Sequence, residues 1–154
     1  MITRFLTRHS VTLLRLALGF VFLSFGVLKF FPGLSPAEEL AERTVESLTF
    51  GFVPERVALL MVATIEVAIG VILLTGRGMR IGIALLSVAL VGILSPLVLL
   101  PDELFRGSIF APTLEGQYVI KDVVLAAAAA VVAAQTLGAR MTTRREFALA
   151  EVKR

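Results

Sequence analysis

Four long apolar blocks most constrain how this chain can fold. They cover about residues 11–31, 57–75, 79–100 and 118–138. A helix needs about 20 apolar residues to cross the hydrocarbon core of a bilayer, and each block has about that length. We therefore expect an all-α integral membrane protein, a four-helix bundle within residues 1–138, followed by a basic cytoplasmic tail at residues 139–154.

Proline and glycine mark the ends of these blocks. Pro32 and Gly33 follow the first block, and Ser95-Pro96 predicts a kink in the third, because proline cannot donate a helical hydrogen bond. Ser35-Pro36-Ala37-Glu38 predicts a helix start with a capping box, and Thr143 to Glu146 predicts another in the tail. Leu40, Thr44 and Leu48 then recur at helical spacing. We expect a short amphipathic helix in this first outer loop.

The basic residues predict the orientation. Cytoplasmic segments of membrane proteins carry an excess of lysine and arginine. Ten basic residues lie on the side of the termini: Arg4, Arg8, Arg15, Arg77, Arg80, Arg140, Arg144, Arg145, Lys153 and Arg154. Five lie on the other side: Lys29, Arg43, Arg56, Arg106 and Lys121. Both termini should therefore be cytoplasmic.

The first block also resembles a signal peptide, with Ser35-Pro36-Ala37 as a candidate cleavage site. The apolar stretch is long, and Lys29 lies between it and that site. We expect the segment to stay as a membrane span.

Residue types exclude several kinds of chemistry. The chain has no cysteine and a single histidine, His9, so thiol redox chemistry, thiolate metal sites and bis-histidine haem ligation within this chain are excluded. We assign no catalytic residue, no metal site and no covalently bound cofactor. A redox role would need a diffusible cofactor or a partner's cofactor. Because the basic residues flank membrane spans, we expect no nucleic-acid partner.

Five charged residues fall at bilayer depth, where charges are costly and are often functional. They are Arg15, Lys29, Glu66, Lys121 and Asp122. Glu66 is the only charge between Val57 and Leu74. It should face the interior of the bundle.

Helical spacing places these charges on small-residue faces. Arg15, Gly19, Gly26 and Lys29 share one face of the first span, and Glu66 shares a face with Gly70 in the second. Glycine lets neighbouring helices approach closely in a membrane, so Gly19, Gly26 and Gly70 are predicted helix-packing positions.

The fourth span adds Tyr118, Lys121 and Asp122 near its outer end. We expect an outer cluster of these three residues with Lys29, in which Asp122 is the favoured partner of Lys29. Glu66 should lie below this cluster.

Three interpretations of the charges remain open. The charges could pair and only fix helix register, which buried ion pairs do in some systems. They could bind a small polar headgroup such as that of a quinone. They could also line a proton or solute path, with Glu66 at its middle and Arg15 at its inner end.

The ordered segments resemble a known family. The first span reads LRLALGFVFLSFGVLKF, the second contains IEVAIGVILLTG, and the fourth opens with EGQYVIKDVVL. Over about residues 12–135 the chain resembles DoxX-like membrane proteins, in particular the YkgB-type branch. The resemblance implies a four-helix bundle in the bacterial cytoplasmic (inner) membrane. It also implies association with oxidative-stress defence or membrane redox assemblies.

We therefore expect an accessory or scaffold subunit of a membrane redox or oxidative-stress-defence system, with quinone as a candidate ligand. Such a chain would at most be a subunit of a quinone-linked oxidoreductase. The alternative is a small-solute or proton-conducting transporter. The expected partners are the lipid bilayer and either a redox protein or a second copy of this chain.

Overall fold

The computed structural model describes residues 2–139, which form seven helices and no strand. The helices are α1 (Ile2–Leu28), α2 (Glu38–Thr49), α3 (Glu55–Thr75), α4 (Met79–Leu94), α5 (Pro96–Leu99), α6 (Pro101–Leu104) and α7 (Leu114–Thr136). Four stretches are long and apolar enough to cross a membrane: Phe5–Leu28, Glu55–Thr75, Met79–Leu99 and Leu114–Thr136. The predicted all-α fold with four spanning helices is confirmed.

The last spanning helix begins four residues earlier than the sequence predicts. Thr113 caps α7, because its hydroxyl oxygen accepts a hydrogen bond from the Gly116 backbone N–H at 3.1 Å. The same hydroxyl donates to the carbonyl oxygen of Glu103 at 2.9 Å. This cap extends the helix back over the polar residues Glu115 and Gln117, which an apolar block does not include.

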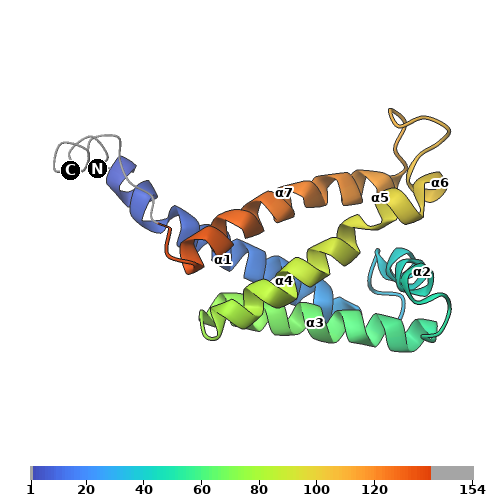
Figure 1. Cartoon of the computed structure of the whole chain (residues 1–154), viewed down its shortest axis with the longest axis horizontal. Coiled ribbons are helices and arrows are strands. Elements are labelled where there is room, and N and C mark those ends of the chain that lie inside the picture. Colours follow the sequence, from blue (N-terminus) through green and yellow to red (C-terminus); the bar gives the residue numbers. More distant parts are fainter. Residues whose placement is uncertain (1, 140–154) are drawn as a thin grey trace.

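The four spanning helices form an elongated bundle (Figure 1). α1 packs along α3, α4 packs against both α3 and α7, and α7 returns against α1. The start of α1 and the end of α7 lie at the same end of the bundle, and α2 and α6 lie at the opposite end, here called the α2 end. The apolar core lies between α1, α3, α4 and α7, and includes Phe22, Ile69, Leu86 and Val132.

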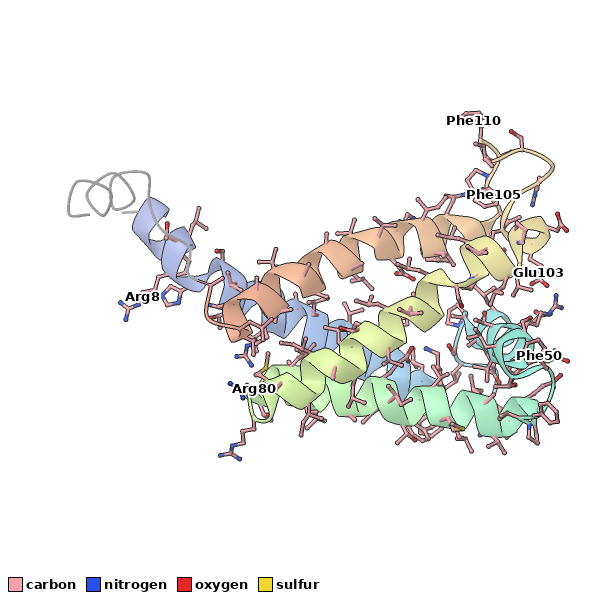
Figure 2. The ribbon with its side chains drawn as sticks, in the orientation of Figure 1. Arg8, Phe50, Arg80, Glu103, Phe105 and Phe110 are labelled. Atoms are coloured by element: carbon pink, nitrogen blue, oxygen red, sulfur yellow. The ribbon has the colours of Figure 1, made fainter. Side chains whose placement is uncertain are left out.

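The two ends of the bundle carry different exposed side chains (Figure 2). Arg8 and Arg80 extend from the end where α1 begins and α7 ends. Phe50 and Phe110 lie at the α2 end, and both are almost fully exposed, at 88% and 89%. Two of the basic residues assigned to the side of the termini therefore do lie together at one end.

Glycines bring α1 and α3 into backbone contact. A Cβ atom added at Gly70 would lie 2.6 Å from the backbone nitrogen of Leu23, and one added at Gly26 would lie 2.8 Å from Cβ of Glu66. Gly19 meets Leu73 and Leu74 in the same way, at 3.0 Å. All three predicted packing glycines therefore lie in one tight helix–helix contact.

The helix α2, which connects the first two spanning helices in the chain, lies across one end of the bundle, and Figure 1 views it nearly end-on. It packs mainly on α3. An ion pair from Arg43 to Glu103, at 2.9 Å, ties it to α6. Arg43 and Glu103 are 60 residues apart, so no local pattern could have predicted this contact.

The start of α2 differs from the expected capping box. Its N-cap is Ala37, without a side-chain hydrogen bond, and the Ser35 hydroxyl is buried with no partner among the described residues. The Glu38 carboxylate instead accepts a hydrogen bond from the backbone N–H of Gly33 at 2.8 Å. α2 begins at Glu38 with Ala37 as its N-cap, so Ser35 lies two residues before the capping position and its hydroxyl does not cap the helix.

The third span is interrupted at the predicted place. α4 ends at Leu94, and α5 begins at Pro96. The predicted helix start at Thr143 lies outside the described residues.

Candidate functional site

A buried ion pair joins α3 to the end of α1. The Lys29 ammonium donates to Oε2 of Glu66 at 2.7 Å, and the two residues are only 4% and 6% exposed. Glu66 is the twelfth of the 21 residues of α3, so the pair lies at the middle of a spanning helix. The expected pairing of Lys29 with Asp122 is therefore wrong, because Glu66 is the residue that Lys29 contacts.

The close packing of α1 on α3 explains this partner. Gly26 lies directly against Cβ of Glu66, and Lys29 follows one helical turn later on the same face. α1 ends at Leu28, beside the middle of α3 rather than at its end (Figure 1). A side chain that leaves this end therefore meets Glu66 first.

Asp122 adds a second carboxylate to this region. It lies on α7, is partly buried, and is near enough to Glu66 and Lys29 for their charges to act on it. Within the described part of the chain, Asp122 forms no ion pair. We call Lys29, Glu66 and Asp122 the charge centre. One cation and two carboxylates give this centre an unbalanced acidic group.

Lys121 and Tyr118 lie outside the charge centre. Both are exposed, Tyr118 by 53%, and the Lys121 ammonium lies over the Tyr118 ring, 5.5 Å from its centroid. This is cation–π geometry on the outward surface of α7. The expected outer cluster of four residues is therefore wrong for these two. Lys121 lies one residue, about 100°, around α7 from Asp122. Tyr118 shares the helical face of Asp122, but it is exposed and contacts Lys121 rather than the charge centre.

Arg15 lies at the other end of α3. Its Nη1 donates to the carbonyl oxygen of Leu73, in the last turn of that helix, and its guanidinium lies over Gly76, the C-cap. Carbonyl groups in the last turn lack partners within the helix, and a cation there also complements the helix dipole. Arg15 thus caps α3 and takes no part in the charge centre.

The fold and this geometry can be compared with known proteins. A family model described as DoxX matches residues 10–101, which is more than half of the 154 residues. The chain belongs to the DoxX family.

The DoxX match includes Arg15, Lys29 and Glu66 and stops before α7, so Tyr118, Lys121 and Asp122 lie outside it. No curated protein and no solved structure matches the chain. The family match and the four apolar helices together identify a multi-pass DoxX-family membrane protein.

Proposed function

We propose that this chain is an accessory subunit of a membrane redox or oxidative-stress-defence system, in the YkgB-type branch of the DoxX family and in a bacterial cytoplasmic membrane. The DoxX family is loosely associated with such functions. The observation that carries the proposal is the charge centre, with a buried pair of Lys29 and Glu66 at mid-span and Asp122 beside it.

A purely structural pair would not need the third group. Lys29 and Glu66 already balance each other, and a further carboxylate at this depth adds a desolvation cost. Ionisable groups at membrane depth commonly serve ligands or protons. Asp122 is therefore the residue of the centre that best supports a function beyond packing.

The donors of Lys29 fit a quinone carbonyl. A lysine ammonium carries three N–H donors, and Glu66 is the one partner found for it among the described residues. Glu66 would hold the ammonium in place, and a second N–H would donate to a quinone carbonyl oxygen. Interconversion of a quinone and its quinol moves two electrons and two protons, and Asp122 and the Lys29 ammonium would each give or take one of these protons. Electrons would come from a partner protein, because this chain has no cysteine and a single histidine. Since Lys29 is only 4% exposed, the headgroup would reach it when neighbouring helices separate.

Mass spectrometry of the purified protein tests this proposal. The wild type, Glu66→Gln and Asp122→Asn would be purified in mild detergent, and Lys121→Gln would serve as an exposed control on the same helix as Asp122. We expect a quinone with the wild type and the control, and a loss of about tenfold or more in both charge-centre variants. If all four proteins purify with the same protein partner and none with a quinone, the scaffold role is supported and quinone binding is excluded.

The geometry gives less support to a proton or solute path. Between Glu66 and the Arg15 end of α3 lie Ile69 and Leu73, both fully buried in the apolar core. If the wild type conducts protons into proteoliposomes and Glu66→Gln abolishes this flux, a proton path is favoured despite the apolar residues between Glu66 and Arg15.

A further inference from the structure

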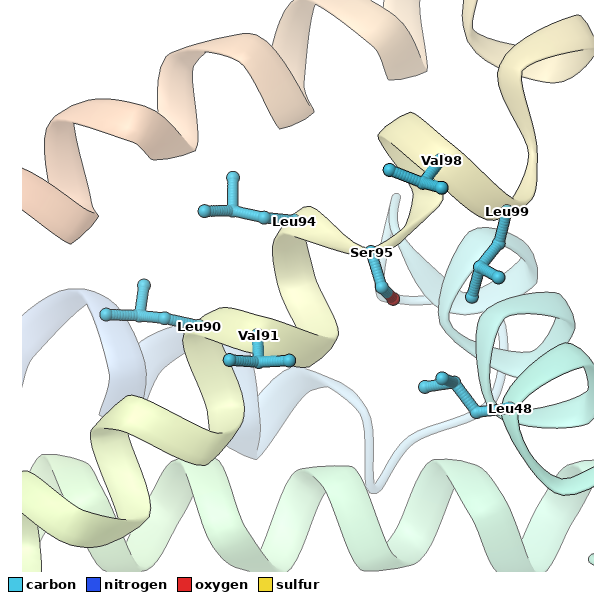
Figure 3. A pocket seen from close by; sticks show the side chains of 7 residues that line it. All are labelled: Leu48, Leu90, Val91, Leu94, Ser95, Val98 and Leu99. Carbon is cyan, nitrogen blue, oxygen red and sulfur yellow. The ribbon is translucent and has the colours of Figure 1, made fainter.

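An apolar groove opens between α2 and the α4–α5 segment (Figure 3). Its volume is about 490 Å³. Its lining residues are Leu48, Leu90, Val91, Leu94, Ser95, Val98 and Leu99. Leu48 comes from α2, and the other six come from the second half of one spanning stretch, Met79–Leu99.

The groove follows from the lengths of the helices. α1 ends beside the middle of α3, so it does not cover α4 and α5 toward the α2 end (Figure 1). α2 crosses this region without closing it, and Figure 3 shows Leu48 on one wall with Val91, Ser95 and Leu99 across from it. The break at Ser95-Pro96 separates the helical segments that carry Val91 and Val98.

The lining determines the chemistry of an occupant. Six of the seven side chains are hydrocarbon, and the hydroxyl of Ser95 already donates to the carbonyl oxygen of Gly92 at 2.7 Å. A groove with no free polar partner holds water poorly. The groove is shallow and open along one side rather than enclosed, so an occupant must be able to lie along it. An aliphatic chain satisfies both conditions.

We propose that this groove holds an acyl chain of a phospholipid from the leaflet next to α2, bound firmly enough to stay with the purified protein. The argument is continuity with the lipid-facing surface. Val91 and Val98 on the rim are 71% and 82% exposed, and both belong to a membrane span, so the groove opens directly onto the hydrocarbon of the bilayer. The lipid site is separate from the charge centre, because no residue of the charge centre lines it.

Native mass spectrometry of the full chain, followed by lipid extraction, tests the site. We expect the wild type to keep about one phospholipid through detergent purification, since the groove is a single site on this span. Val98→Trp would place an indole ring across the rim of the groove and lower the retained phospholipid about tenfold. Val88→Trp is the matched control, because Val88 is exposed on the same span but does not line the groove.

Leu48→Phe fills the groove from the opposite wall and decides the question if Val98→Trp does not fold. Equal retention in the wild type, both groove variants and the control would overturn the proposal. So would the absence of lipid from the wild type, an isoprenoid lipid in place of phospholipid, or a dimer that only the groove variants disrupt.

The chain also offers a direct probe of the groove's surroundings. It has no tryptophan, so the indole fluorescence of the Val98→Trp variant would come from one site. We expect phospholipids with brominated acyl chains to quench this emission strongly and aqueous iodide to leave it unchanged. Quenching by iodide alone would place water at the groove and contradict the proposal.

Discussion

At the scale of single residues, the Lys29–Glu66 pair makes the sharpest prediction. Lys29→Met leaves a carboxylate buried without a partner, and breaking a buried ion pair in this way costs about 3–5 kcal/mol. We expect a large fall in the thermal unfolding midpoint in detergent. An unchanged midpoint would mean that the pair does not stabilise the fold.

The double variant Lys29→Met, Glu66→Met is the control for this loss. Replacing both charges by apolar side chains of similar length often restores stability, since no unpaired charge remains. We expect unfolding near that of the wild type. A stable double variant that no longer retains the quinone proposed above would separate the proposed function from folding at this pair.

Arg15 should act through the end of α3. Arg15→Leu leaves the Leu73 carbonyl without its donor, and a hydrogen bond from a charged group is worth about 1.5–3 kcal/mol. Arg15→Lys keeps a cation near the C-cap and should recover part of the loss. Unfolding midpoints of the three proteins test this order. If Arg15→Leu and Arg15→Lys unfold at the wild-type temperature but both lose the proposed function equally, Arg15 has a functional role.

At the scale of elements, glycine contact sets the distance between α1 and α3. Gly70→Ala places a methyl group 2.6 Å from the backbone nitrogen of Leu23, so the helices must separate. We expect destabilisation of about 1–3 kcal/mol, the usual cost of overpacking. Denaturant unfolding of Gly70→Ala and of the wild type measures this difference in stability.

Gly92→Ala is the matched control. Gly92 is also helical, and a Cβ atom there meets nothing within 4 Å. Alanine should stabilise this position by about 0.5–1 kcal/mol, because it loses less backbone freedom on folding. If the free energy of unfolding changes in the same direction in Gly70→Ala and Gly92→Ala, a packing role for Gly70 is contradicted.

The amphipathic helix α2 should respond to pH through Glu42. Partial burial raises the pKa of Glu42 above its ordinary value of 4.5, and the nearby carboxylates of Glu38 and Glu55 raise this pKa further. The ionised form is thus less favourable in the folded state than in the unfolded state. Glu42 therefore destabilises the fold above its raised pKa, and this effect disappears below the ordinary value of 4.5.

Glu42→Gln should accordingly raise the unfolding midpoint at pH 7 and have little effect below about pH 4. Glu46→Gln, an exposed position on the same helix, is the control and should change little at either pH. Melting curves of the three proteins at both pH values provide the measurement. If Glu42→Gln raises the unfolding midpoint equally at both pH values, the charge of Glu42 is not the cause of the change.

At the scale of the whole molecule, the positive-inside rule predicts that the α2 end faces away from the cytoplasm. The chain has no cysteine, so each introduced thiol is unique. Ser108→Cys lies in the exposed loop before α7, and Thr75→Cys lies at the exposed opposite end. In intact spheroplasts, a membrane-impermeant maleimide should label position 108 and not position 75. The reverse pattern would invert the topology.

The bundle also explains which inferences the sequence could support. Length and hydropathy determined the four spans, because a bilayer requires long apolar helices whatever their neighbours are. The faces of Gly19, Gly26 and Gly70 followed from helical spacing alone. These properties depend only on residues close together in the chain.

Only the tertiary structure decided the partners of the charges. Lys29 meets Glu66 because α1 ends beside the middle of α3, and a chain position does not reveal where one helix stops along another. Lys121 and Asp122 are neighbours in sequence, yet they point to opposite surroundings, because one residue turns an α-helix by about 100°. The apolar blocks of this protein are a local property, whereas the contacts of its buried charges depend on the relative length and rotation of packed helices.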